Sequence, residues 1–294
     1  MEKKYPTFSI CNLVSNKLSK DLFNADKFEG YLINNPPIKN IHKHSFYHLV
    51  YFTKGKGVHT IDFTNYAIEA GCIYFMIPGQ VHHWKFEEDE VEGYVINFSD
   101  IFFDQIFLSS SVIDQFTFFN VFSDLQMLKL SENIRPRIVE IFEIILKEMA
   151  KSDEYTMMMI AAEMLRLFIL VSRELPVKAT ILSNGNRSSV FLKQFFNLIE
   201  DNFKELRLPK DYASLLYVTS NHLNFVCKDN LNRSAGEIIR NRILLEAKRM
   251  LVNYDLSVAN IAMELSFFDT SYFIKFFKKY TGYTPDNFRK QYYS

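Results

Sequence analysis

Cysteine is scarce in this chain of 294 residues, which contains only Cys11, Cys72 and Cys227. No two of them form a C-x-x-C pair, so their spacing indicates neither a zinc ribbon nor a disulfide framework. Few and unpaired cysteines favour a reducing compartment, and we expect a cytoplasmic protein. We also expect no signal peptide, because the first ten residues carry charge without an apolar run.

Long apolar runs and enzyme motifs are also missing. The most apolar stretch, Met157–Val171, is interrupted by Glu163 and Arg166, so we predict no membrane span and no membrane partner. The chain has no G-x-S-x-G, Walker, G-x-G-x-x-G or H-E-x-x-H motif. We therefore predict that the protein is not an enzyme, has no catalytic residues and needs no cofactor.

The chain has no excess of positive or negative charge, because it contains 34 Lys and Arg and 34 Asp and Glu. The two halves differ, however. From Val190 onward there are 15 basic and 11 acidic residues, whereas residues 1–189 contain 19 basic and 23 acidic residues. A mildly basic module joined to an acidic one suits nucleic-acid binding by the second half, although a net charge of this size carries no argument alone.

A polar stretch separates these halves. Pro176 and the run Ser183-Asn184-Gly185-Asn186 form turn signals between helical patterns. The length and the apolar content of 48% allow two domains with cores of their own. We predict a first domain over 1–175, a linker over 176–189 and a second domain over 190–294.

The stretch Val258–Lys290 carries the most specific pattern in the chain. Apolar spacing predicts a short helix around Ile261. Asp269, Thr270 and Ser271 offer an N-cap for a second helix, and Gly282 offers its C-cap. One apolar face is predicted for this second helix, made by Tyr272, Phe273, Phe276, Phe277 and Tyr280. Its other face is polar and cationic, as a helix that enters the major groove of DNA requires. The residues predicted to contact DNA are Thr270, Ser271, Lys275, Lys278 and Lys279.

This stretch resembles the signature of the AraC-type (arabinose-regulator-like) transcription regulators, I-A-x-x-x-G-F-x-D-x-S-Y-F-x-R-x-F-K-K-x-x-G-x-T-P-x-x-[FY]-R. The matching residues are Ile261, Ala262, Phe267, Asp269, Ser271, Tyr272, Phe273, Phe277, Lys278, Lys279, Gly282, Thr284, Pro285, Phe288 and Arg289. Ser266 stands where the family has Gly, at a turn that favours a left-handed residue. Lys275 stands where Arg is common, which weakens a bidentate contact to guanine.

A second helix pair is predicted upstream, in Asp211–Asn232. Thr219 or Ser220 caps its second helix, and Leu223 belongs to its apolar face. The resemblance implies that this pair is the first of two helix-turn-helix units, joined by a long helix over Glu237–Leu251. The residues predicted to face DNA here are Asn221, His222, Asn224 and Lys228.

Apolar runs separated by turn residues in the first half predict short strands at regular spacing. This pattern is typical of a small sandwich or barrel. The strands are expected at His48–Thr53, Val58–Phe63, Cys72–Ile77, His82–Phe86 and Gly93–Phe98. The order H-x-H-x-x-x-H, then G-x-x-x-x-x-x-P-G-x-x-H, resembles a cupin barrel, the usual sensor half of AraC-type regulators. The expected fold class is therefore α+β, with an N-terminal cupin-like β-barrel and helical hairpin and a C-terminal all-α double helix-turn-helix domain.

Histidines in this half fall near the metal-ligand positions of enzymatic cupins, but His48 stands where those enzymes have Glu. Imidazoles can bind Zn²⁺, Ni²⁺ or Fe²⁺, and sensor cupins commonly keep such residues without metal. We expect no metal here and a role in local hydrogen bonding at the barrel mouth. The residues expected to contact a small effector are His42, His44, His82, Trp84 and Tyr94.

Residues Phe98–Phe122 are rich in Phe, and we expect them to cover one sheet face, with a lid over an apolar effector as the alternative. Two amphipathic helices follow. The first has a stripe from Ile138 to Met149. The second has a stripe made by Met157, Met158, Ala161, Leu165, Phe168 and Ser172. They resemble the hairpin through which AraC-type regulators dimerise, but packing inside the domain would give the same pattern.

The sequence thus predicts a cytoplasmic regulator of transcription that binds double-stranded DNA in sequence-specific fashion. By resemblance, a small effector or partner bound to the first domain controls it, and its partners are RNA polymerase, as for an activator, and a second copy in a homodimer. Two alternatives stay open. One is a metal-dependent cupin enzyme fused to a DNA-binding module, and the other is a regulator with no small-molecule effector.

Overall fold

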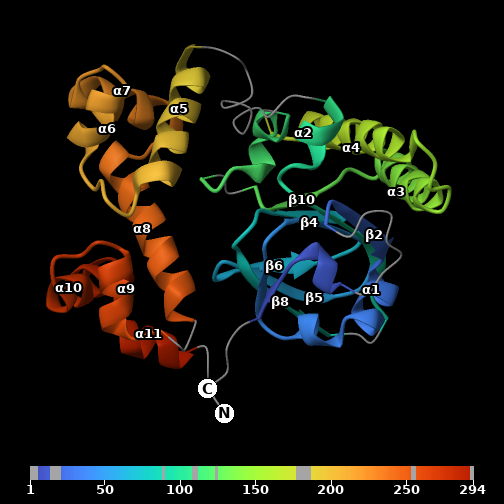
Figure 1. Cartoon of the computed structure of the whole chain (residues 1–294), viewed down its shortest axis with the longest axis horizontal. Helices are drawn as coiled ribbons and strands as arrows, with labels where there is room; N and C mark the ends of the chain where they lie inside the picture. Colours follow the sequence, from blue (N-terminus) through green and yellow to red (C-terminus); the bar gives the residue numbers. More distant parts are fainter. Residues whose placement is uncertain are drawn as a thin grey trace. The chain divides into compact units, whose positions relative to one another are not determined.

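The computed structural model describes residues 6–13, 21–87, 90–107, 112–122, 125–176, 187–252 and 256–291. The described residues form two compact units, one within 6–176 and one within 187–291 (Figure 1). Residues 177–186 of the predicted linker lie outside the described residues. None of the described helices is long and apolar enough to cross a membrane.

Two five-stranded sheets form the first unit. The first sheet has the order β1 (Thr7–Phe8), β3 (His42–His44), β8 (Val81–Phe86), β5 (Gly57–Ile61), β6 (Thr64–Ile68). The second has the order β10 (Met127–Lys129), β7 (Cys72–Met76), β4 (Tyr47–Lys54), β9 (Glu92–Phe98), β2 (Phe23–Lys27). One apolar core contains side chains from both sheets, among them Ile61 and Trp84 of the first sheet and Val50 and Val95 of the second.

The α+β class is confirmed, but the predicted barrel is not closed. Among the described residues, the edge strands of one sheet do not pair with those of the other, so the sheets stay separate. The spacing of apolar runs predicts that strands exist, whereas closure depends on pairings between edge strands that no sequence period encodes. The architecture is an open sandwich.

Helices cover the outer face of the second sheet. α3 (Arg135–Met149) and α4 (Thr156–Arg173) form the predicted hairpin, which lies over this sheet in Figure 1. The Phe142 ring of α3 stacks on Tyr94 of β9 at 4.8 Å between centroids. α2 (Phe102–Phe107) lies beside the same core, and α1 (Phe28–Asn34) packs near β9 and β2. The sheet is therefore buried on both faces.

The Phe-rich segment forms core, as predicted. Phe98, Phe102, Phe118 and Phe119 are buried in the cluster between the second sheet and the helices, together with Phe168 of α4. Rings in this cluster meet mostly edge-to-face, as Phe119 and Phe168 do at 5.1 Å, which is a favoured arrangement for aromatic pairs.

The predicted apolar stripe of α4 coincides only in part with the face that the helix buries. Ala161 and Phe168 are buried, but Met158 is exposed. The residues that α4 buries are Thr156, Ile160, Ala161, Met164, Leu167, Phe168, Leu170 and Val171. Because α4 carries apolar side chains around most of its circumference, the helical period indicates a helix but does not fix which side faces the core.

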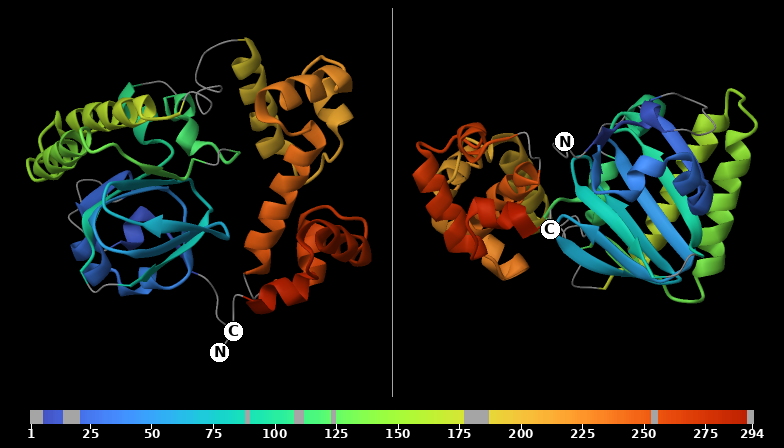
Figure 2. Two further views of the ribbon diagram at one scale, coloured as in Figure 1. Left: turned by 180° about the vertical axis from the view of Figure 1, so that it is seen from behind. Right: turned by 90° about the horizontal axis from the view of Figure 1, so that it is seen from below.

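Seven helices make up the described part of the second unit. They are α5 (Arg187–Asn202), α6 (Pro209–Leu215), α7 (Ser220–Leu231), α8 (Ala235–Leu251), α9 (Val258–Glu264), α10 (Thr270–Thr281) and α11 (Pro285–Gln291). α8 is the long predicted helix, and Figure 2 shows it between the pair α6–α7 and the pair α9–α10. The double helix-turn-helix arrangement is thus present.

Local capping explains where these helices begin and end. The Thr219 and Asp269 side chains accept hydrogen bonds from the third backbone N–H that follows each of them, at 3.2 and 2.7 Å, as predicted. Asn232 and Gly282 end α7 and α10 in the left-handed region, at φ 53° and 82°. Such positions favour Gly and tolerate Asn.

The predicted aromatic face of α10 is too wide. Only Phe273 and Phe277 are buried, whereas Tyr272 and Tyr280 are 55% and 41% exposed. The seven residues of α9 cover one stripe of α10. The neighbouring stripe is covered in part by the Phe267 ring, which lies 5.2 Å from the Phe276 ring.

We expect Phe273→Ala to destabilise the second unit by about 3–5 kcal/mol, because it removes a fully buried ring. Phe268→Ala is the matched control: this ring, in the same motif, is 99% exposed, so its loss changes stability by no more than about 0.5 kcal/mol. Urea unfolding followed by circular dichroism measures both. Equal losses in the two variants would contradict the described packing of α10.

Candidate functional site

Two copies of one local structure present α7 and α10. In each, a short helix is followed by a left-handed residue, Tyr217 at φ 56° or Ser266 at φ 53°. The next N–H then donates to a carbonyl five residues back, at 2.9 Å from Val218 and 2.8 Å from Phe267. The strained turn predicted at Ser266 is therefore real, and the same turn occurs upstream.

The first of these helices, α7, exposes three of its four predicted DNA-facing residues. Asn221, His222 and Lys228 are exposed. Asn224 is only half-exposed, because its Oδ1 accepts from the Ala235 N–H at 3.1 Å and its Nδ2 donates to the Ser220 carbonyl at 3.1 Å. The Oδ1 of Asn224 thus holds α7 against the start of α8, whereas its Nδ2 bonds within the first turn of α7.

The second helix, α10, exposes Ser271, Lys275, Lys278 and Lys279, and half-buries Thr270. The first turn lies at the capped N-terminus, where backbone N–H groups attract anions such as phosphate. Phe225 of α7, which shares a helix face with Asn221 and Lys228, is 66% exposed. We predicted no contact with DNA for it, because it stands where AraC-type regulators often have Arg.

Arginines hold the two helix pairs in place. The Arg207 guanidinium lies 3.6 Å above the Phe267 ring and donates to the Leu265 carbonyl, at the turn before α10. Arg289 of α11 donates to the carbonyls of Leu251 and Leu256, at 2.9 and 2.6 Å. The signature residues Phe267 and Arg289 therefore act in the fold of the unit.

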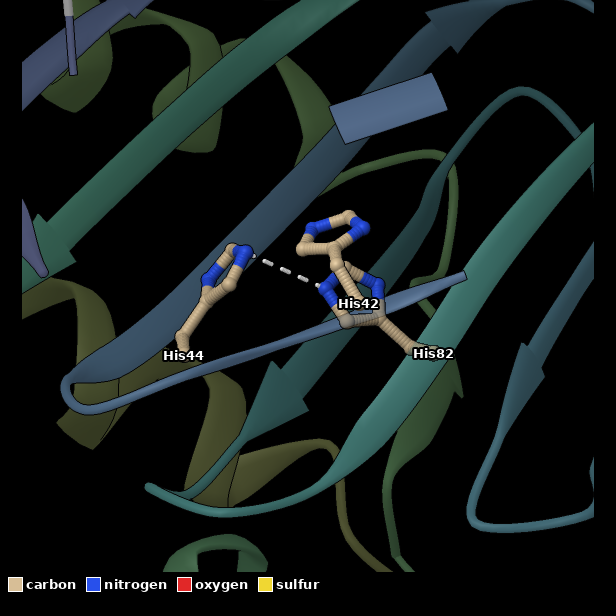
Figure 3. Close-up of side chains that lie close together, drawn as sticks. All are labelled: His42, His44 and His82. Carbon is tan, nitrogen blue, oxygen red and sulfur yellow. Dashed lines mark hydrogen bonds between the residues drawn. The ribbon is translucent and has the colours of Figure 1, made fainter. Parts of the chain in front are cut away.

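A cluster of imidazoles lies between the two sheets of the first unit. His42 and His44 come from β3 and His82 from β8, and these three converge in Figure 3. The rings of His48 and His59 lie 5.4 and 5.3 Å from the His82 ring. All five side chains are buried. His59 was missed by sequence reasoning, although it alternates with Val58 and Thr60 on a strand that pairs with β8.

Hydrogen bonds fix part of this cluster. His42 Nδ1 donates to the Asn40 carbonyl at 2.7 Å, and His48 Nδ1 donates to Asn97 Oδ1 at 2.5 Å. The ring nitrogens of His59 and His82 lie 3.1 Å apart, and those of His82 and His44 lie 3.3 Å apart. Each interaction is within the cluster or with a neutral backbone or amide oxygen.

Burial keeps these imidazoles neutral. It lowers the pKa of His42 to about 4 and that of His48 to about 3. Burial, together with repulsion between neighbouring imidazoles, holds the pKa values of His44, His59 and His82 well below the usual range. At neutral pH each ring therefore carries one N–H and one lone pair.

Two further residues were expected at the effector site. Trp84 lies beside the histidine cluster, whereas Tyr94 lies away from it. The Trp84 ring lies 4.9 Å from the His82 ring, and its indole nitrogen is buried without a hydrogen-bond partner. Tyr94 faces the opposite side of the second sheet, where its hydroxyl donates to Glu143 at 2.6 Å. The histidines and Trp84 are thus one site, and Tyr94 belongs to the packing of α3.

The comparisons with known proteins agree with this geometry. A family model of the AraC-like ligand binding domain matches residues 38–167, and a helix-turn-helix domain model matches residues 212–291. The chain belongs to the AraC-type family of transcription regulators, with a ligand-binding domain in its first half.

Several relatives span most of the chain. The Msm operon regulatory protein of Streptococcus mutans is 23% identical, covering 98% of this chain and 96% of its own. The transcriptional activator RhaR of Mannheimia succiniciproducens is 20% identical, covering 87% and 89%. The crystal structure of ToxT from Vibrio cholerae is similar at a TM-score of 0.46, with 14% identity, covering 91% of this chain and 97% of that chain.

We expect the first unit to lose stability as the pH falls. An unfolded histidine takes up a proton near pH 6.5, whereas the buried ones resist protonation. The unfolded state therefore binds more protons below that pH, and unfolding becomes easier. From about pH 7.5 to about pH 5.5 the loss is about 1 kcal/mol for each such histidine.

Urea unfolding of the full chain at several pH values, in a chelating buffer, measures this loss. The unfolding of the second unit, which contains only His222 among the seven histidines, is the internal control and is expected to respond less. A first unit whose stability does not change over this pH range would contradict the neutral, buried state of the cluster.

Proposed function

We propose that this regulator binds DNA as a homodimer, with α7 and α10 of each chain entering successive major grooves. The observation that carries the proposal is the repeated helix-turn-helix, which presents two capped helices with polar and cationic outer surfaces. Helices of this kind enter the major groove with their N-terminal residues nearest the bases. Two grooves on one face of the duplex lie about 10 bp apart.

The exposed residues take different roles in this proposal. Thr270, Ser271 and Lys275 lie in the first half of α10 and contact base edges. Lys278 and Lys279 lie in its last turn and contact phosphates. On α7, Asn221 and His222 face the bases and Lys228 a phosphate. Asn224 supports α7 from within, since its amide is used by Ser220 and Ala235.

Control of DNA binding is proposed to lie in the first unit. A small effector bound between the sheets, at His42, His44, His82 and Trp84, changes the activity of the second unit; Tyr94 is left out, because it faces α3. We also propose that the chain acts in the cytoplasm without enzymatic activity and contacts RNA polymerase. The relative from Mannheimia succiniciproducens, named a transcriptional activator, supports this.

We expect Lys275→Ala to relax base preference at one position, at a cost of about 1–3 kcal/mol on the preferred sequence only. Lys278→Ala is expected to weaken binding to all sequences alike and to reduce the salt slope by about one unit. Binding-site selection followed by fluorescence anisotropy at several salt concentrations separates the two effects.

Lys151→Ala is the control, because it removes the same charge from the first unit, where Lys151 pairs with Glu148. Unchanged sequence preference in Lys275→Ala would show that this lysine does not read a base. Absence of any preferred sequence for the full chain would refute the proposal itself.

The homodimer is proposed to form through the outer face of α4. This face carries the exposed large apolar side chains of Tyr155, just before α4, Met158, Met159 and Ile169, and it also carries Arg166 and Arg173. Exposed apolar surface of this kind occurs at interaction sites more often than on the rest of a protein surface. Phe168, in contrast, is fully buried in the core of the unit, so it is unavailable to a partner.

We expect Met158→Asp to convert the dimer to a monomer that keeps its fold, because a buried unpaired charge is costly at an interface. Arg137→Asp places the same side chain at an exposed position of α3 and is expected to leave the dimer intact. Sedimentation velocity with circular dichroism measures both. A wild-type monomer at micromolar concentration would contradict the proposed interface.

A further inference from the structure

The imidazole cluster leaves buried ring nitrogens without hydrogen-bond partners. These atoms are His42 Nε2, His44 Nδ1, His48 Nε2 and His59 Nδ1. Buried polar atoms in folded proteins are nearly always paired, so an unpaired atom at this place, such as His42 Nε2, indicates a ligand. No carboxylate belongs to the group of converging side chains.

The protonation of His42 is fixed by its backbone partner. A carbonyl oxygen only accepts, so the Asn40 carbonyl requires the proton on His42 Nδ1. His42 Nε2 consequently carries a lone pair that no described donor meets. His48 is oriented in the same way by Asn97 Oδ1, and Asn97 is itself held by Asn24 at 3.0 Å. A ring held by an outer hydrogen bond, with its other nitrogen free, is the usual arrangement of a metal-binding histidine.

The spacing of three rings fits one small cation. One nitrogen from each of His42, His44 and His82 lies within 4.8 Å of the other two. The His44–His82 pair is already 3.3 Å apart, close to the separation of about 3.3 Å that two imidazoles have when bound tetrahedrally to Zn²⁺. A modest movement of the His42 ring brings all three to bonding distance.

We propose that His42, His44 and His82 bind a divalent transition-metal ion of the Zn²⁺, Co²⁺ or Ni²⁺ type. Imidazole suits these ions, whereas Ca²⁺ and Mg²⁺ require oxygen ligands. His59 fixes the His82 ring through Nδ1, at 3.1 Å, so that the opposite nitrogen faces the ion. Three histidines leave a fourth position for a water or a small ligand.

The ion is the ligand that the first unit senses, or a part of it. This proposal names the effector of the proposed function. A regulatory role of the ion rests on that proposed function, whereas the binding of the ion does not. Ion binding is measured in the absence of DNA, however, so a failure of the metal site and a failure of DNA binding are distinguished from the start.

The test uses the full chain without a histidine tag, stripped with a chelator and titrated with Zn²⁺ or Co²⁺ alone. We expect one ion per chain, and a Co²⁺ absorption spectrum of the intense tetrahedral type. His42→Gln and His82→Gln are expected to lower the affinity by at least about 100-fold, and His59→Gln, which alters an outer partner, by about 10–100-fold. His83→Gln is the matched control, since His83 is adjacent on β8 but does not belong to the group that can hold an ion.

A second measurement does not depend on the folding of any variant. X-ray absorption of the wild-type chain loaded with Zn²⁺ is expected to show three imidazole nitrogens and no sulfur. A sulfur shell would place the ion on a cysteine and overturn the proposal. Wild-type protein that binds no ion, or a folded His82→Gln variant that binds as tightly as His83→Gln, would also overturn it and favour an organic effector at the histidines.

Discussion

The burial of the second sheet on both faces is the constraint on which the first unit depends. Alternate residues of a strand point to opposite faces, so β4 supplies two cores. Leu49 and Tyr51 pack under the helical hairpin, whereas His48, Val50 and Phe52 point between the sheets. A shift of one residue in register would exchange these sets and remove His48 from the histidine cluster. The same alternation on β9 places Tyr94 under α3 and Val95 between the sheets.

Much of this architecture could be predicted from short-range patterns. The caps at Thr219, Asp269 and Gly282 act on residues three or four positions away, so their effect is written locally in the sequence. The five strands expected from apolar runs are present with small shifts of their ends. The short strands β1, β3 and β10 were not expected, because two or three residues carry no measurable alternation. The five-residue strands β2 and β6 were not expected either.

What could not be predicted depends on contacts between distant residues. The meeting of His59 with His82 follows from the pairing of β5 with β8, and no local pattern specifies which strands become neighbours. The side of α4 that faces the core is decided by the sheet beneath it. Tyr94 was assigned to the effector site because aromatic residues suit both a core and a binding site. For α7 and α10, the sequence predicted exposed residues well, but the Asn224 Oδ1 accepts a hydrogen bond from the start of α8.

The hydrogen bonds of Arg289 have a consequence for the order in which the second unit is completed. Its guanidinium joins carbonyls that lie 38 and 33 residues earlier in the chain, at the end of α8 and just before α9. Domains fold as units while the ribosome releases the chain from its N-terminal side. The helix pair α6–α7 can therefore pack on α8 while α11 is still inside the ribosome, whereas the two hydrogen bonds that join the end of α8 to the segment before α9 form only after α11 emerges. A nascent chain would carry one finished half of the module before the other, and the second half would gain its last hydrogen bonds only when synthesis is almost complete.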